Sequence, residues 1–460
     1  MQLPPTLIRS LEGLPGFDEK AFIDVHNANA PVTSVRLNPL KTTHVQLLTE
    51  GRQISAAKVP WSVYGYYLDQ RPSFTFDPLF HAGTYYVQEA SSLFLEEALR
   101  QTVDLKEDLK ILDLCAAPGG KSTHLQSLIA ANSLLVSNEV IRSRASVLRD
   151  NIVKWGASNV AVTNNDPKDF ARLPGFFDVV VVDAPCSGSG LFRRDSEAIE
   201  EWSENNVMLC SQRQQRILAD VLPALKQGGV LVYSTCSYSR QEDEAVLQWL
   251  AGTFDLEPVT LQLNPAWNII ETQSGPHTGY RFWPHLLKGE GLFMTVLRKN
   301  AAAGTTGKYR PKTKALSAKA AAPLGQWLQA EGSRFVNFGD KIYAWPEPLF
   351  EWLDFLAQQL KIIYSGTLAG EMIRDKLIPD HALAMSPLIT KDAARLTLSE
   401  EDAIRYLQRK ELADTVPVSR GWQLAAFRGF PIGWMNVLAN RINNYYPKEL
   451  RILKEQRLNQ

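Results

Sequence analysis

Two cysteines sit in short turns rich in small residues, each directly after an apolar run that is typical of a β-strand. Cys186 lies in the turn DAPCSGSG (183–190), and Cys236 lies in the segment STCSYS (234–239). If the preceding strands are neighbours in a parallel sheet, both turns lie at its carboxyl edge, where such sheets bind ligands. A thiolate is an effective nucleophile, so the pair predicts covalent catalysis in one shared pocket. A redox disulfide is the alternative, but it leaves Asp183 without a role.

A second candidate site is the turn in ILDLCAAPGGKS (111–122), between a strand-like run and a helix-like segment. Small residues let a ligand approach the backbone, and the start of the helix offers free N–H groups. Lys121 has a second interpretation, as a solvent-facing residue of the first helical turn. The residues of this turn that we assign to ligand binding are Cys115, Ala116, Ala117, Pro118, Gly119, Gly120 and Lys121.

This segment has three possible interpretations: it binds one of two kinds of ligand, or it is a turn that binds no ligand. Residues 115–122 nearly match a phosphate-binding loop, but Cys115 replaces the first glycine of that motif. An adenosine-type cofactor instead requires an acid at the end of the second strand, to bind the ribose hydroxyl groups. Glu139 lies 19 residues after Gly120, and Asp166, after the third strand, could bind the adenine edge. These two acids favour the adenosine-type cofactor.

The elements that must position these residues are short apolar strands alternating with segments of helical length. Continuous apolar strands between helices predict a parallel sheet covered on both faces, and hence an α/β fold. We expect the helix after Cys236 to begin near Gln241 and to stabilise the thiolate with its free N–H groups. The expected strands are 110–115, 134–138, 160–164, 178–183, 229–235 and 292–297, and two expected helices are 142–155 and 206–225.

Composition excludes several classes of protein. Of the 460 residues, 45% are hydrophobic and 21% are charged, which excludes a wholly disordered or fibrous chain. No apolar run is long enough to span a membrane, and the N-terminal residues lack the apolar core of a signal peptide. Four cysteines do not make a disulfide framework, so we expect a cytoplasmic protein in which Cys115 and Cys210 are inert. The sequence has neither a CxxC spacing nor a close pair of histidines, so it does not indicate a metal site.

The charges balance, since 49 Lys and Arg residues face 49 Asp and Glu residues. A net charge of zero argues against nucleic-acid binding over the whole surface, but it leaves room for a local basic stripe. The basic residues of 300–323 form such a stripe, which is either a solvated tether or a flexible arm for a polyanion.

A hairpin is expected at 334–345, turning at Gly339-Asp340. We predict five regions: 1–100, 101–299, the linker 300–323, an α+β accessory domain at 324–395, and 396–460.

Several motifs together resemble the NOL/NOP/Sun family of RNA cytosine-C5 methyltransferases. DLCAAPGGKS, NEV, DAPCSGSG and STCSYS occur in that order, followed by RFWPH (281–285) and GLFM (291–294). Upstream, RLNPLK (36–41) and YVQEASS (86–92) also look like that family. The resemblance covers residues 30–300. The extension 324–460 is similar to the bacterial RsmF branch, which methylates small-subunit ribosomal RNA and carries a PUA-like C-terminal domain.

The resemblance implies a Rossmann-like class I methyltransferase with a mostly parallel seven-stranded sheet, between an N-terminal α+β RNA-recognition domain and a PUA-like extension at 396–460. The implied cofactor is S-adenosyl-L-methionine, held by the glycine turn, by Glu139 at the ribose and by Asp166 at the adenine. Cys236 would attack carbon 6 of cytosine, and Cys186 would assist release of the adduct. Asp183, which also belongs to the implied cofactor site, would hydrogen-bond the ring edge.

The implied partner is RNA, in particular 16S ribosomal RNA or the small subunit, bound by a monomer that has no membrane contact. Phe192, Arg193 and Arg194 follow the glycine-rich turn, where a ring and two cations could receive RNA; surface packing explains Phe192 equally well. Three alternatives stay open: a transfer RNA methyltransferase, a DNA-type enzyme in which Cys186 attacks, and a noncatalytic RNA-binding assembly factor.

Overall fold

The apolar runs form the centre of one large sheet. The computed structural model describes residues 3–28, 30, 32–305, 307, 309–329, 331–373, 376–412 and 419–455. Five strands run parallel in the order β7-β6-β5-β8-β9, and β13 and β12 follow at one side. The bounds of these strands are β5 Lys110–Asp113, β6 Leu134–Asn138, β7 Val160–Thr163, β8 Phe177–Asp183, β9 Leu225–Thr235, β12 His277–Phe282 and β13 Leu292–Lys299.

These seven strands are the mostly parallel part of a larger sheet. β13 runs antiparallel to both of its neighbours, β9 and β12, so six of the seven strands point the same way. Three further strands make it a ten-stranded sheet: β11 (Ile270–Ser274) beside β12, β10 (Leu256–Pro258) beside β13, and β16 (Ile362–Ser365) beside β7. The α/β class is confirmed. The strands that we did not expect are short or come from distant sequence, so local patterning does not reveal them.

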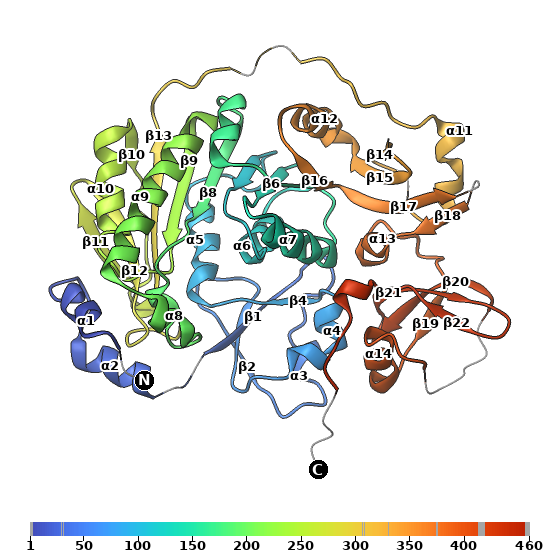
Figure 1. The fold of residues 1–460 in the computed structure, drawn as a ribbon, viewed down its shortest axis with the longest axis horizontal. Helices are drawn as coiled ribbons and strands as arrows, with labels where there is room; N and C mark the ends of the chain where they lie inside the picture. Colours follow the sequence, from blue (N-terminus) through green and yellow to red (C-terminus); the bar gives the residue numbers. More distant parts are fainter. Residues whose placement is uncertain are drawn as a thin grey trace.

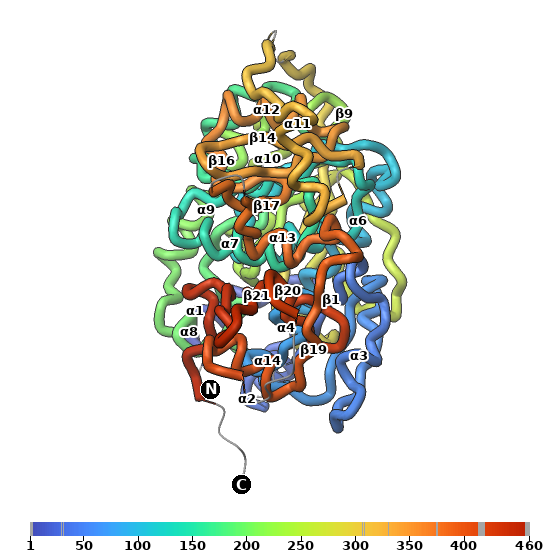
Figure 2. The backbone as a smooth tube through the Cα atoms, turned by 90° about the vertical axis from the view of Figure 1, so that its right-hand side faces the viewer, coloured from blue at the N-terminus to red at the C-terminus, as the bar shows by residue number. Residues whose placement is uncertain are grey.

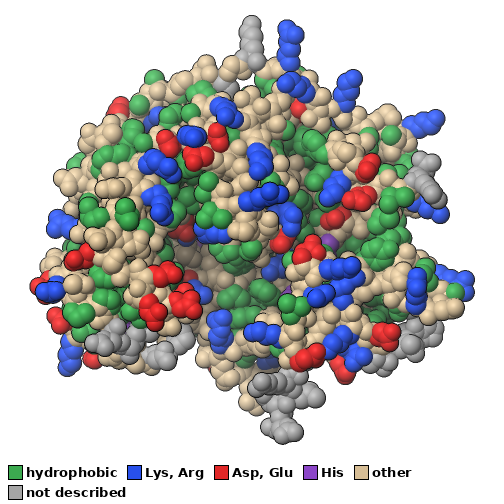
Figure 3. Space-filling model, in the orientation of Figure 1, with side chains coloured by type: hydrophobic (Ala, Val, Ile, Leu, Met, Phe, Trp, Pro, Cys, Tyr) green, Lys and Arg blue, Asp and Glu red, His purple; other side chains and the backbone are tan. Residues whose placement is uncertain are grey.

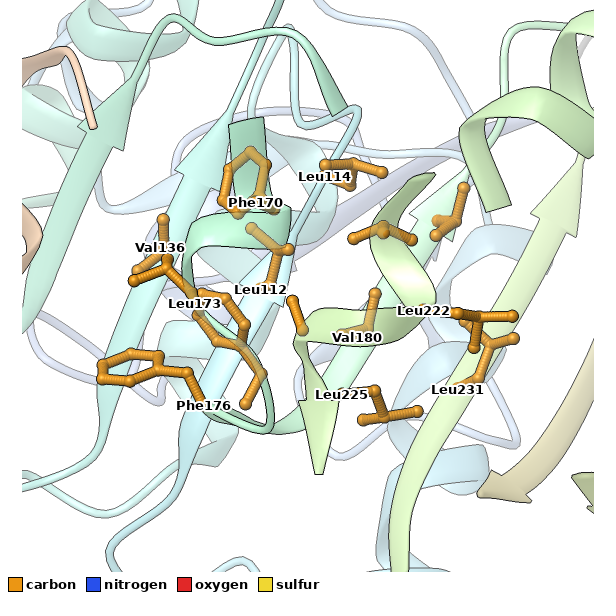
Figure 4. Close-up of a cluster of buried hydrophobic side chains, with 14 of the residues drawn as sticks. Leu112, Leu114, Val136, Phe170, Leu173, Phe176, Val180, Leu222, Leu225 and Leu231 are labelled. Carbon is orange, nitrogen blue, oxygen red and sulfur yellow. The ribbon is translucent and has the colours of Figure 1, made fainter. Parts of the chain in front are cut away.

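Helices cover both faces of this sheet (Figure 1). Because side chains alternate along a strand, Leu112, Val180 and Leu231 face α9 (Glu204–Val221) and α10 (Glu244–Thr253). Their neighbours Ile111 and Val179 face α6 (Gly120–Leu128) and α7 (Arg142–Trp155). Figure 4 shows part of the first of these two cores. α7 has the bounds expected from the sequence because Gly156, with a φ of 95°, ends it in the left-handed conformation.

The N-terminal region forms its own four-stranded sheet, in the order β2-β3-β1-β4. Its first two helices, α1 (Pro5–Leu11) and α2 (Glu19–Asn27), do not cover that sheet, because they pack instead against Tyr238 and Trp283 of the large domain. Short helices α3 (Gln46–Thr49), α4 (Pro78–His81) and α5 (Leu95–Arg100) complete the region. The four strands are β1 Thr33–Leu37, β2 Ala56–Lys58, β3 Gly65–Leu68 and β4 Tyr85–Val87.

Two smaller sheets follow the large one. The first, β14-β15-β17-β18, contains the expected hairpin, and the second, β19-β20-β21-β22, packs with α14 (Glu400–Leu407) onto the N-terminal sheet. Figures 1 and 2 both place this last sheet beside α4. The strand bounds are β14 Ser333–Phe338, β15 Lys341–Pro346, β17 Thr367–Ile373, β18 Lys376–Pro379, β19 Arg395–Thr397, β20 Gly421–Phe427, β21 Phe430–Val437 and β22 Ile442–Asn444.

The accessory region at 324–395 shares its core with the large domain. β16 pairs with β7, and Trp345 of β15 and Leu353 of α12 (Phe350–Gln359) pack in the same cluster as β5 and β8. Part of the predicted linker is also held here, because Asp354 accepts hydrogen bonds from the backbone N–H groups of Lys312 and Thr313 at 3.0 and 2.9 Å. Lys308 lies outside the described residues. The five domain boundaries stay a prediction.

Among the described residues, no helix has the length and apolar character needed to cross a membrane.

Replacing Leu353 with Ala tests the shared core. Leu353 is fully buried, so the cavity should lower the free energy of unfolding by about 2–5 kcal/mol. Because β16 and α12 belong to the large core, denaturant unfolding followed by tryptophan fluorescence should show one transition, shifted as a whole. Leu209→Ala is the matched control: Leu209 is 60% exposed, and its loss should change stability by less than about 0.5 kcal/mol. A second transition that keeps the wild-type midpoint would contradict the shared core.

Candidate active site

One cavity of about 750 Å³ lies at the carboxyl edge of the parallel strands. In Figure 3 the surface is hollowed between the region of α8 (Glu197–Glu201), where acidic side chains gather, and that of α7, where basic ones gather. The cavity therefore combines the glycine turn, the acid after the second strand and both cysteine turns. The predicted site residues that line it are Cys115, Ala117, Glu139, Asp183, Cys186 and Cys236.

The glycine turn joins β5 to α6. Gly119 is the residue before the helix and has a φ of 114°, a left-handed conformation that favours glycine. Neighbouring elements hold the carbonyl groups of the turn: Arg144 donates to Ala117 O at 2.9 Å, and Asn151 donates to Pro118 O at 2.8 Å. Ala116 donates its own N–H to Asn138 O at 2.8 Å. The turn is thus held rigidly against β6 and α7.

A buried arginine of the N-terminal sheet supports the same turn from behind. Arg36 donates to Thr123 Oγ1 at 2.6 Å and to Gly120 O at 3.3 Å, and its guanidinium lies 4.5 Å from the ring centroid of Trp155. Burial lowers its pKa to about 9, so it remains charged near neutral pH. Sequence analysis included Arg36 only as part of a motif. Its role depends on a contact between two regions that the sequence does not reveal.

Lys121 is not a solvent-facing residue; that alternative was wrong. Its side chain is 10% exposed, and Nζ lies 2.7 Å from Asp183 Oδ2, at the end of β8. Burial alone would lower the pKa of Lys121, but the charge and hydrogen bond of Asp183 outweigh it, and the pKa is raised. Ser234 of β9 donates to the other oxygen of Asp183 at 2.8 Å. Asp183 therefore links α6, β8 and β9 at the edge of the cavity.

The two acids predicted to bind the cofactor lie in different settings. Glu139 is buried at the cavity wall, where Oε1 accepts the N–H of Ile141 at 2.9 Å and Oε2 lies 3.5 Å from Arg144. Asp166 instead caps the short helix η3 (Pro167–Arg172) by accepting the N–H of Lys168 at 3.2 Å. Its neighbour Pro167 lines the cavity. The cofactor roles of both acids stay predictions.

The two cysteines meet as the sequence predicted. Cys186 Sγ and Cys236 Sγ lie 2.8 Å apart, and both line the cavity. The hydrogen bond with Cys236 raises the pKa of the Cys186 thiol well above its usual value, and burial raises it further. Cys186 therefore keeps its proton at neutral pH. Burial also raises the pKa of Cys115 and of Cys210, so these two thiols are neutral, in line with the inert role expected for them.

The helix after Cys236 begins later than expected. α10 starts at Glu244, and the predicted start near Gln241 was wrong. The residues before it form a turn because their acids point inward: Asp243 accepts from Thr235 Oγ1 at 2.7 Å and lies 3.1 Å from Arg281. Arg281 also pairs with Glu244 at 2.5 Å. This buried charge cluster, rather than a helix terminus, supports the strand end that carries Cys236.

The residues expected to receive RNA after the glycine-rich turn are mostly buried. Phe192 is fully buried in the cluster with α1 and α2, so its placement on the surface was wrong. Arg193 is also buried and donates to Ala30 O at 2.7 Å and to Gly289 O at 3.1 Å. Only Arg194 is exposed. The sequence could not show that the N-terminal helices cover this segment.

Sequence analysis missed two arginines at the cavity, Arg213 and Arg216 of α9, which line it on the exposed side. Their spacing of one helical turn places them on one face. It also missed Glu242, described below. The described residues contain no group of three or more His, Cys, Asp or Glu side chains that could hold a metal ion.

Asp113, at the end of β5, gives a pH test of the site. It is fully buried, accepts a hydrogen bond from Ser122 Oγ at 2.7 Å, and burial raises its pKa to about 7. An unfolded aspartate has a pKa of about 3.9, so between these values the folded state binds more protons, and stability falls by about 1.4 kcal/mol per pH unit. Asp113→Asn removes this contribution.

The stability of Asp113→Asn relative to wild type should therefore improve as the pH rises from about 4 to about 7, and stay level above that. Urea unfolding at several pH values measures the difference. Asp195→Asn, at an exposed carboxylate, is the control and should show a constant difference. A constant difference for Asp113→Asn as well would mean that Asp113 ionises normally.

Three family models match separate parts of the chain. The model of 16S rRNA methyltransferase RsmB/F matches residues 100–298, and the N-terminal domain of 16S rRNA methyltransferase RsmF matches residues 3–90. The methyltransferase RsmF PUA domain matches residues 393–452. These matches agree with the resemblance stated from the motifs, and they extend it to the C-terminal sheet.

Two solved structures from Pyrococcus horikoshii have a similar fold. A methyltransferase homolog protein is 29% identical with a TM-score of 0.50, and the match covers 65% of this chain and 100% of that one. NSun6 solved with SFG has a TM-score of 0.54 at 20% identity, and the match covers 65% of this chain and 98% of that one. This second likeness concerns the fold alone.

Two curated relatives extend over nearly the whole chain. Ribosomal RNA small subunit methyltransferase F of Aeromonas salmonicida is 31% identical over 448 residues, covering 91% of this chain and 90% of that protein. The protein of the same name from Escherichia coli is 29% identical over 435 residues, with the same coverage. The predicted resemblance is confirmed. The chain belongs to the ribosomal RNA small subunit methyltransferase F family.

Proposed function

We propose that this chain methylates carbon 5 of cytosine in 16S ribosomal RNA of the small subunit, with S-adenosyl-L-methionine as methyl donor. The observation that carries the proposal is the contact between Cys186 and Cys236 inside the cavity that also holds Glu139 and the glycine turn. One thiol can bond to the base while the other serves its release, and a donor at the turn lies beside both.

The residues around the turn fit S-adenosyl-L-methionine. The Glu139 carboxylate at the cavity wall keeps lone pairs that can accept two ribose hydroxyl groups. Val140 and Ile141 give the same wall an apolar surface that suits an adenine ring. When bound, the cofactor supplies an electrophilic methyl carbon to the cavity.

A nucleoside triphosphate fits this cavity poorly. In a phosphate-binding loop the lysine must reach the phosphates, whereas Lys121 is paired with Asp183 at 2.7 Å. Five acids line the cavity against three arginines, so the charge at its wall is negative on balance and disfavours a triphosphate. The charges therefore favour a ligand without phosphate groups.

The chemistry assigned to the chain begins with Cys236. Carbon 5 of cytosine is a weak nucleophile, and attack of the Cys236 thiolate on carbon 6 turns the ring into an enamine that reacts at carbon 5. Asp183 lies at the cavity edge with its side chain 35% exposed, where a carboxylate can hydrogen-bond the ring edge and stabilise the protonated pyrimidine. After removal of the carbon-5 proton, the bond from Cys236 to carbon 6 breaks, and Cys186 assists this release.

The target base must leave its stack to enter the cavity, so a single-stranded loop or an opened helix is the expected substrate. We propose that the C-terminal sheet contributes to RNA binding, because Arg409, Lys410 and Lys448 line a second cavity of about 610 Å³ there. A monomer acting in the cytoplasm is part of this proposal. Methyl transfer from radiolabelled S-adenosyl-L-methionine to 16S ribosomal RNA, with transfer RNA as the comparison substrate, tests the assignment directly.

Replacing Glu139 with Ala should weaken cofactor binding. The loss of charge-assisted hydrogen bonds to the ribose is expected to cost about 1–3 kcal/mol, which raises Kd by roughly 5- to 150-fold. Titration calorimetry with S-adenosyl-L-methionine measures this change. Glu351→Ala, at an exposed carboxylate on α12, should keep the wild-type Kd. Binding of ATP with magnesium, in a protein that does not bind S-adenosyl-L-methionine, would revive the triphosphate hypothesis.

The two thiols should differ when each is replaced by Ala. Cys236→Ala cannot form the bond to carbon 6, so we expect no turnover and no protein–RNA adduct. Cys186→Ala should still form the adduct but release it slowly, and a species that survives denaturing electrophoresis should accumulate. Cys210→Ala, on α9, is the control and should turn over normally.

The opposite pattern, with the adduct accumulating in Cys236→Ala, would assign attack to Cys186, as in DNA-type enzymes. Full turnover in both variants would remove covalent catalysis by these two thiols from the account, whereas no turnover in the wild-type chain would favour the noncatalytic alternative.

A further inference from the structure

One buried carboxylate joins the two turns that carry the thiols. Glu242 Oε1 accepts the backbone N–H of Ser187 at 2.8 Å, and Oε2 accepts the Ser187 hydroxyl. The same Oε2 accepts the hydroxyl of Ser237 at 2.6 Å. Ser187 directly follows Cys186, and Ser237 directly follows Cys236. The same carboxylate therefore contacts the residue that follows each of the two cysteines.

A third element holds this carboxylate in place. Gln214 of α9 donates to Glu242 Oε1 at 3.1 Å and also to Pro185 O at 3.0 Å, directly before Cys186. The hydroxyl of Tyr233 donates to the backbone carbonyl of Glu242 at 2.6 Å. Each oxygen of the carboxylate thus receives two donors, and these come from α9 and from the two turns.

The setting of Glu242 is costly for a charge. Its side chain is fully buried, and among the described residues no Lys, Arg or His lies within ion-pair distance of it. Burial raises its pKa, and the four hydrogen bonds oppose this rise. A buried carboxylate without a counter-ion costs stability. The four hydrogen bonds that Glu242 accepts offset part of this desolvation cost.

We propose that Glu242 is the positioning residue that holds the Cys186 and Cys236 sulfur atoms in contact, by linking the turns that follow them. The assignment of catalysis to these thiols rests on the proposed function, whereas their spacing does not. Glu242 touches neither sulfur, so it acts through Ser187 and Ser237.

The hydrogen-bond pattern distinguishes two substitutions. The donors at Oε1 are N–H groups, which only donate, whereas both donors at Oε2 are hydroxyl groups, which can also accept. In Glu242→Gln the amide oxygen can take the Oε1 position and the NH2 group the Oε2 position, so the link is kept. Glu242→Ala removes the acceptor that these four donor groups share.

The first experiment measures the spacing of the thiols without RNA or cofactor. Phenylarsine oxide bonds to two neighbouring thiols through its arsenic atom, with loss of one water molecule, so tight binding reports a close pair. The wild-type chain should bind one equivalent, and Cys186→Ala should not. Glu242→Ala should bind at least about 10-fold more weakly, because the residues that follow the two thiols lose the carboxylate that they share, whereas Glu242→Gln should stay near wild type.

The second experiment measures methyl transfer. Because misplacing reacting groups by about 1 Å can cost about 100-fold in rate, Glu242→Ala should lose about 100-fold in kcat while its KM for S-adenosyl-L-methionine stays within about twofold. Glu242→Gln should recover most of the rate. Asp354→Ala is the matched control: Asp354 is an equally buried carboxylate that accepts several hydrogen bonds, but it lies on α12. At equal loss of thermal stability it should keep its kcat.

Three results would overturn the proposal: wild-type arsenical binding in Glu242→Ala, a Glu242→Gln variant as defective as Glu242→Ala, or an equal loss of kcat in Asp354→Ala. If the wild-type chain transfers no methyl group at all, the proposed function fails, but the arsenical experiment still decides the role of Glu242.

Discussion

The register of three parallel strands is the constraint on which the site depends. β8 lies between β5 and β9, and the pairing places Asp183 beside Ser234 and Asp113 beside Val181. Cys186 and Cys236 each follow one member of the Asp183–Ser234 pair by a few residues, so two turns of different sequence reach the same point. A shift of one residue would turn the alternate side chains toward the cavity and separate the thiols.

Several buried charges at this edge are paired with charges of opposite sign. Lys121 and Asp183 neutralise one another across α6 and β8, and Arg281 pairs with Asp243 and Glu244 below Cys236. The interior weakens solvent screening, so each pairing is stronger and each loss is more damaging than at the surface. The same pairings that stabilise the sheet edge therefore hold the reactive groups in place.

The N-terminal, accessory and C-terminal regions are not joined to their neighbours by linkers alone, because they share a sheet or a hydrophobic core with them. β16 extends the central sheet beyond β7, the helices α1 and α2 pack on Tyr238 and Trp283, and the C-terminal sheet shares a core with β1 and β4. Arg36 reaches from the N-terminal sheet to the helix that begins at the glycine turn. The N-terminal and C-terminal regions therefore have defined positions relative to the cavity.

The sequence by itself determined the features that depend on local patterning. Apolar runs located six strands of the seven-stranded core, Gly156 marked the end of α7, and small residues around Cys186 and Cys236 marked the turns at the sheet edge. Strand order then made the meeting of the two thiols predictable. The family motifs identified the rest of the site in outline, since each lies in a short continuous segment.

Only the tertiary structure decided which distant groups become partners. Glu242 looks like an ordinary acid before a helix until α9 and two turns converge on it, and Phe192 looks exposed until the N-terminal helices cover it. β16, only four residues long, becomes a strand because the edge of β7 offers it unpaired backbone groups. Such contacts depend on the approach of segments far apart in the chain, and their energies come from burial and hydrogen bonding that no local pattern contains.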